Sequence, residues 1–222
     1  METNQKAWNR QQKEFRNILL GFDRPGEAVR LFLIQHAMLH SAQVSQSDTW
    51  SYEDEILDDM SAEQIRRIPS NCEHSIAWVI WHLARIEDVT MNQLVAGTPQ
   101  LLQRDNWLER MKITTRHTGN AMDEASMAEL SAAIDLEAMR AYRVAVGRRT
   151  REIVRQIEPE MFKQKVEPSR FRKVWDEGAV VEAASSIVNY WSKRNIAGLL
   201  LMPPTRHNFL HLNEAARLKQ RR

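Results

Sequence analysis

Two histidines near the end of the chain, His207 and His211, are spaced so that they could hold one metal ion together. Four residues make about 400° of rotation in an α-helix, so both imidazoles project from the same face, one turn apart. A helix that only packs against a core would more naturally carry leucine at both positions. The pair therefore indicates a metal site, in which a catalytic ion of the zinc type usually takes three protein ligands plus water.

The third ligand has to come from another segment, and His82 is the best candidate. It lies in a segment whose apolar residues repeat at intervals of three and four, which is typical of a helix buried along one side: Ile76, Val79, Leu83 and Ile86. His82 falls at the edge of this stripe, one turn after Trp78. We therefore predict that His82, His207 and His211 bind one divalent ion.

The other histidines and the cysteine offer weaker chemistry. His36 and His40 form a second pair at helical spacing, but they lie within an apolar stripe, which favours structural imidazoles over metal ligands. An enzyme that uses His36, His40 and His82 is the alternative. Cys72 precedes a helix without a neighbouring histidine–aspartate pair to activate it, so an unreactive thiol is expected. Two further histidines are assigned no role: His74 and His117.

Length and composition predict an all-α domain. The chain has 222 residues, of which 43% are hydrophobic and 27% are charged. Glycine and proline number seven each, whereas good helix formers are plentiful. We therefore expect a single domain over residues 1–222, with a core from about 26 to 219 and a leading segment over residues 1–20.

The charge pattern and the hydropathy argue against several partners. Acidic and basic residues are interleaved to a formal net charge of +2, and only residues 219–222 form a basic run, so no nucleic-acid partner is expected. No stretch approaches the roughly 20 apolar residues of a membrane span. The single cysteine and the polar N-terminus, which lacks a signal-peptide pattern, predict a cytoplasmic protein.

Four long helices should form the core, with a further helix for the late histidine pair. The predicted helices cover residues 26–44, 73–92, 127–157 and 180–201. Long connections are expected over residues 45–70, 100–120 and 163–177. Pro203 and Pro204 should break the fourth helix, and the second proline should start the helix of His207. The acidic residues of the first connection, Glu53 among them, and the Asp88–Asn92 side of the second helix should face solvent.

Two of these segments resemble the DinB/YfiT-like family of metal-dependent enzymes. The segment 75–88 has a small residue, an apolar run, Trp81-His82-Leu83 and an acidic pair, which is similar to the family's second helix. The late His207-x-x-x-His211 pair, followed by Asn213-Glu214, resembles its ligand helix. The resemblance covers about residues 26–219. It implies a four-helix bundle, here with extra short helices, and a three-histidine metal site that corresponds to His82, His207 and His211.

The resemblance also implies a reaction. Some members of the family are S-transferases or isomerases that use low-molecular-weight thiols such as bacillithiol or mycothiol. We therefore expect an enzyme that uses Zn²⁺ or Ni²⁺ to activate a small thiol for S-transfer to an electrophilic small molecule. The alternatives are a metal-dependent hydrolase and a non-enzymatic stress-related or interaction protein on the same bundle.

Two further expectations concern a neighbour of the site and the assembly. Glu214 lies on the ligand face, where it could orient an imidazole or pair with an arginine. Members with this bundle often pair, and seven tryptophans exceed what a core of this size needs, so a homodimer is expected.

Overall fold

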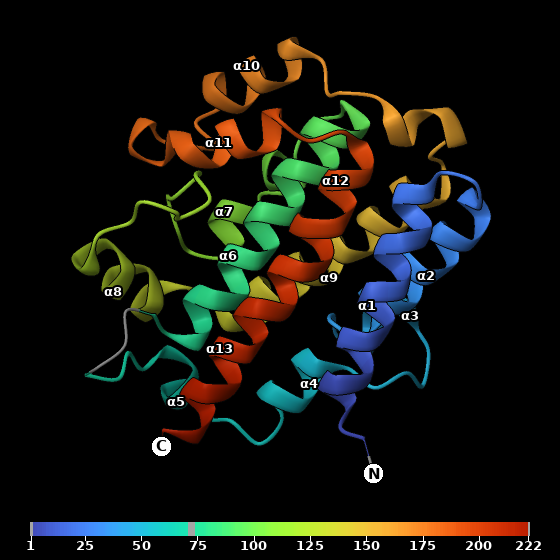
Figure 1. Cartoon of the computed structure of the whole chain (residues 1–222). Coiled ribbons are helices and arrows are strands. Elements are labelled where there is room, and N and C mark those ends of the chain that lie inside the picture. Colours follow the sequence, from blue (N-terminus) through green and yellow to red (C-terminus); the bar gives the residue numbers. More distant parts are fainter. Residues whose placement is uncertain (1, 71–73, 222) are drawn as a thin grey trace.

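The computed structural model describes residues 2–70 and 74–221. Four long helical segments, called arms below, pack side by side as a bundle (Figure 1). The arms are α2 (Pro25–Ala37), α6 (Ile76–Asp88) with the π-helical η1 (Val89–Ala96), α9 (Leu136–Arg155), and α12 (Ile196–Leu201) with η5 (Met202–His207) and α13 (Asn208–Gln220). α2 packs on α9 and η5, while α6 packs on α9 and α13. The described residues contain no β-strand, so the all-α prediction is confirmed.

Shorter helices occupy the connections and one end of the bundle. They are α3 (Ala42–Ser45), α4 (Tyr52–Leu57), α5 (Ala62–Arg66), η2 (Leu101–Gln103), α7 (Trp107–Arg110), α8 (Glu124–Ala133), η3 (Pro159–Lys163), α10 (Pro168–Asp176), η4 (Glu182–Ala184) and α11 (Ser185–Ser192). Within the described ranges, no helix is both long and apolar enough to cross a membrane.

The N-terminal helix α1 (Asn4–Gly21) packs against α2 and α12. Its apolar residues Trp8 and Phe15 are fully buried. The ring of Trp8 stacks on Phe209 of α13 with centroids 4.1 Å apart, and its Nε1–H donates to the carbonyl oxygen of Gln35. The leading segment therefore covers the α2 and α13 side of the bundle, and α1 is part of the packed structure.

Three of the predicted long helices are interrupted, and a side chain caps the helix that restarts after each break. The helix predicted over 26–44 ends at Ala37, and Ser41 caps α3. The 127–157 helix is divided between α8 and α9, where the carboxylate of Asp135 accepts a hydrogen bond from the free backbone N–H of Ala138. The 180–201 helix is divided into α11 and α12, and Asn195 caps the second. The region 163–177, predicted to be irregular, contains the helix α10 over residues 168–176.

The predicted break at Pro203 and Pro204 does not occur. α12, η5 and α13 continue as one rod (Figure 1), with both prolines buried in the π-helical turn. Proline lacks an N–H, so the preceding carbonyls need other donors. The Thr205 hydroxyl donates to the Leu200 oxygen at 3.0 Å, and Gln12 Nε2 approaches the Leu201 oxygen at 3.5 Å. These donors allow the chain to pass through two prolines without ending the helix.

The prediction that Glu53, Asp88 and Asn92 face solvent is also wrong, since all three are buried. Glu53 pairs with Arg143 of α9.

Asp88 accepts a hydrogen bond from the Tyr142 hydroxyl at 2.5 Å. It also accepts hydrogen bonds from the side chains of Arg85 and Asn92 and from the backbone N–H groups of Leu101 and Leu102. Donors from distant segments thus compensate for the lost hydration of these polar groups.

Candidate metal centre

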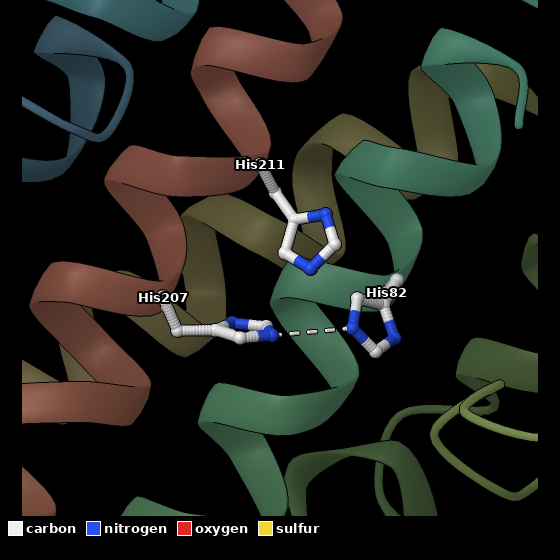
Figure 2. Close-up of side chains that lie close together, drawn as sticks. All are labelled: His82, His207 and His211. Carbon is white, nitrogen blue, oxygen red and sulfur yellow. Dashed lines mark hydrogen bonds between the residues drawn. The ribbon is translucent and has the colours of Figure 1, made fainter.

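Three imidazoles converge between α6 and the last helical arm. Figure 2 shows His82 on α6 facing His207 and His211 of the neighbouring rod. One ring nitrogen from each histidine lies within 4.8 Å of the others. The Nε2 atoms of His82 and His207 are 3.3 Å apart. The structure thus assembles the three histidines that the sequence singled out, from segments 125 residues apart in the chain.

Helix geometry explains why His207 and His211 meet. His207 ends the π-helical η5, His211 lies one turn later in α13, and their ring centroids are 4.6 Å apart. Because α12, η5 and α13 form one rod that packs on α6, the pair is held opposite His82.

A backbone carbonyl orients His82. Its Nδ1–H donates to the carbonyl oxygen of Thr118 at 2.5 Å, which leaves the Nε2 lone pair directed at the other two histidines. The indole of Trp78 stacks on the ring at a centroid distance of 4.6 Å. Burial, together with the nearby His211, lowers the pKa of His82 to about 3, so the ring is in the neutral form that binds metals.

A carboxylate orients His211. Glu214 accepts from His211 Nδ1 at 2.8 Å through one oxygen and from His74 Nδ1 at 2.6 Å through the other. Partial burial raises the pKa of Glu214, but these hydrogen bonds outweigh it and bring that pKa to about 2. The arrangement leaves Nε2 of His211 as the nitrogen free to bind a ligand, which is the carboxylate–histidine pairing found beside metal ions. It realises the orienting role expected for Glu214.

His207 completes the group, and its distance from His82 shows whether the group fits a metal ion. Burial and the neighbouring His82 and His211 hold its pKa well below the ordinary histidine value. Two nitrogens bound at about 2.0–2.1 Å to one tetrahedral zinc ion would lie about 3.3–3.4 Å apart, and the His82–His207 separation of 3.3 Å matches this. Three imidazoles with converging nitrogens therefore fit a divalent first-row metal.

A cavity of about 580 Å³ opens beside the group and is lined by both His82 and His211. Its other lining residues are His74, Trp78, Gly119, Asn120, Met122, Asp123, Glu124 and Met127. The cavity has the size of a small-molecule site, and its lining combines three apolar side chains with six polar or charged ones. A small ligand in it would lie against two of the three imidazoles.

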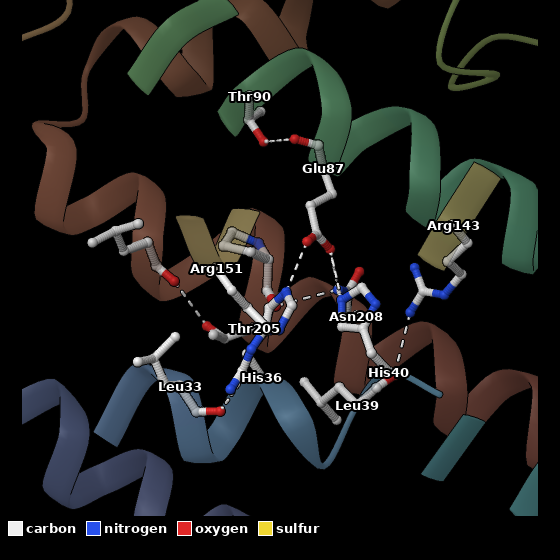
Figure 3. A network of polar contacts seen from close by, with 12 residues as sticks. Leu33, His36, Leu39, His40, Glu87, Thr90, Arg143, Arg151, Thr205 and Asn208 are labelled. Atoms are coloured by element: carbon white, nitrogen blue, oxygen red, sulfur yellow. Dashed lines mark hydrogen bonds and ion pairs between the residues drawn. The ribbon is translucent and has the colours of Figure 1, made fainter. Parts of the chain in front are cut away.

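His36 and His40 form a separate group with Glu87 (Figure 3). Both Nε2 atoms contact the Glu87 carboxylate, at 2.8 and 3.0 Å, and Asn208 donates to it at 2.8 Å. All four side chains are fully buried. Burial lowers the pKa of His40 to about 3 and that of His36 as well, so two neutral imidazoles donate to a buried carboxylate.

This second group does not include His82, so the alternative site of His36, His40 and His82 is not assembled. Every Glu87 oxygen already accepts hydrogen bonds from neutral donors, which is the pattern of a buried structural network. Asn208, the residue after His207, connects this network to the helix that carries the three-histidine group.

His74, to which sequence reasoning assigned no role, lies at the cavity. His74, Trp78 and His82 follow one another at intervals of four, and their rings form a stack with centroids 3.9 and 4.6 Å apart. That spacing is the feature of the sequence from which a role for His74 could have been predicted. No such feature marks Thr118, because it contacts His82 through its backbone oxygen. The expectation for Cys72 lies outside the described residues.

Comparison with known proteins supports the fold. The DinB superfamily matches residues 47–188, which include His82 and precede His207 and His211. No curated protein matches the chain. Since the match spans more than half of an all-α chain, the protein belongs to the DinB superfamily.

Proposed function

We propose that this protein is a metal-dependent enzyme that binds one divalent ion through His82, His207 and His211 and activates a small thiol for transfer to an electrophile. The observation that carries the proposal is the convergence of three imidazoles beside a cavity of small-molecule size. When bound, an ion with an open coordination position supplies Lewis acidity and lowers the pKa of a thiol or water molecule next to it. The ion proposed is Zn²⁺ or Ni²⁺.

The residues around the histidines have defined tasks in this proposal. Thr118 and Glu214 fix which nitrogen of His82 and of His211 faces the ion. Trp78 holds the His82 ring from one side, and in the cavity it offers apolar surface to the organic part of a substrate. His74 donates its Nδ1–H to Glu214, so in its neutral form Nε2 is the atom that could take a proton from a ligand in the cavity.

The resemblance to thiol-using members of the family favours thiol transfer over hydrolysis. The test uses metal-loaded protein, a panel of low-molecular-weight thiols and a chromogenic electrophile, with a chromogenic ester assayed in parallel without thiol. We expect consumption of the electrophile that depends on both the metal and one thiol. His211→Ala should abolish this rate, whereas Lys112→Ala, which pairs with Asp135 away from the cavity, should retain it.

Two outcomes contradict the proposal. Ester cleavage without thiol, at full metal occupancy, would favour the hydrolase. No turnover of either substrate, with one ion bound per chain, would favour a non-enzymatic role for the bundle.

A further inference from the structure

A second and larger cavity, of about 810 Å³, is lined by seven basic side chains and by no acidic residue. They come from four segments distant in sequence: Lys13 and Arg16 in α1, Lys163 and Lys165 in and after η3, Lys193 and Arg194 between α11 and α12, and Arg206 in η5. The whole chain has a formal net charge of only +2. The positive charge is therefore concentrated in one hollow where the fold brings these segments together.

None of the seven cations pairs with a carboxylate in the described part of the chain. Lys165 donates to the backbone oxygen of Lys193, Arg206 donates to the amide oxygen of Asn9, and Arg194 lies over the ring of Tyr190 at 4.4 Å. These contacts orient the side chains but leave their charges uncompensated. Like charges brought within a Debye length, about 8 Å at physiological salt, repel one another.

The shape and lining of the hollow suit a small ligand. α1 lies beside α12 on one side of the bundle (Figure 1), and the cavity is formed along this contact. Gln12 and Asn195 add amide groups, while Tyr190, Leu201 and Met202 add apolar surface. A volume of this size lies within the range of small-molecule sites.

We propose that this cavity binds a small polyanion that carries two or more phosphate groups. Arginine forms paired hydrogen bonds to phosphate oxygens and lysine neutralises them as a point charge, and the cavity presents both. Several phosphates on one ligand would neutralise cations from all four segments at once. The proposal does not depend on the metal centre, because no histidine lines this cavity.

The test is isothermal titration of the full-length protein with inorganic tripolyphosphate at about 0.15 M salt. The double variant Lys13→Glu/Lys193→Glu reverses two lining charges, one within a helix and one at a helix C-cap. The control, Arg104→Glu/Arg172→Glu, makes the same net charge change at one C-cap and one helical position outside the cavity. Both variants keep the three-histidine group, so any chelation of a bound metal by the ligand contributes equally to both titrations.

We expect one tripolyphosphate per chain, affinity at least tenfold weaker in the cavity variant, and affinity within twofold of the wild type in the control. Adenosine triphosphate without magnesium, titrated in parallel, distinguishes the source: tighter binding than tripolyphosphate indicates a nucleotide, and equal binding indicates the phosphates alone. No binding to the wild type, or an equal loss in both variants, would overturn the proposal. Binding of single-stranded oligonucleotides that strengthens from 4 to 20 nucleotides would assign the surface to nucleic acid instead.

Discussion

His82 and His207 approach each other with their Nε2 atoms 3.3 Å apart, although one lies on α6 and the other in the π-helical turn that precedes α13. Each ring is kept neutral by burial, which lowers its pKa. Two neutral imidazole nitrogens at this distance gain at most one hydrogen bond between them, whereas a divalent ion would use both lone pairs. The relationship makes the three-histidine group the candidate metal centre of the molecule.

Replacing Glu214 by glutamine should weaken metal binding without removing a ligand. Glutamine keeps the shape but accepts fewer and weaker hydrogen bonds, so His211 and His74 lose their common charged partner. We expect about 10- to 100-fold lower affinity for the ion, measured by competition with a chromogenic chelator. Glu124→Gln removes a charge from the same cavity and should leave the affinity unchanged. Equal losses in both variants would assign the effect to the cavity's charge.

Thr205 should stabilise the rod through its hydroxyl. Thr205→Val keeps the side-chain volume but removes the donor to the Leu200 oxygen, so the free energy of unfolding should fall by about 1–2 kcal/mol. Thr150 is the matched control, since it is equally buried and its hydroxyl has no partner among the described residues. Thr150→Val should be neutral or stabilising in the same urea titration. A Thr205→Val protein as stable as the wild type would contradict the stabilising role of this hydroxyl in the unbroken helix.

The metal-free protein should lose stability as the pH falls below about 6.5. Burial lowers the pKa values of His36, His40 and His82, so they stay neutral in the folded chain but take up protons when it unfolds. Each contributes a loss of at most about 1.4 kcal/mol per pH unit between about 6.5 and its folded pKa. Urea unfolding midpoints measured from pH 8 to pH 5 test whether stability falls with pH as predicted. Constant stability across this range would show that the folded and unfolded chains take up protons equally, and it would contradict the lowered pKa values of the three rings.

The association state remains a prediction of a homodimer. The argument that the tryptophans exceed what one core needs is weakened, because five of them are buried within one chain: Trp8, Trp78, Trp81, Trp107 and Trp191. Light scattering at micromolar concentration should give twice the chain mass of 25.9 kDa. A mass of one chain would contradict the prediction.

Local patterns predicted which histidines lie close together, because the spacing within each helix sets the face on which a side chain lies. The turn from His207 to His211 and the apolar repeat around His82 are both visible in the residues themselves. The unbroken passage through Pro203 and Pro204 could not be predicted, since it depends on Thr205 and Gln12 supplying donors in three dimensions.

Burial of charge could not be predicted from the sequence either. Glu53 and Asp88 are acidic residues of the type that usually faces solvent, and only the arrival of Arg143 and Tyr142 from α9 makes their burial tolerable. In the same way, the role of Thr118 depends on where a connection folds, because any residue could supply its carbonyl.

The most direct test of the three-histidine metal site is elemental analysis of the purified protein and its histidine variants, with circular dichroism to confirm that each is folded. The wild type should hold one divalent ion per chain. His82→Ala, His207→Ala and His211→Ala should each lose most of it, while His36→Ala and His40→Gln should keep about one ion despite lower melting temperatures. If His36→Ala loses the ion and His207→Ala keeps it, the metal lies in the Glu87 network and the assignment to His82, His207 and His211 is wrong.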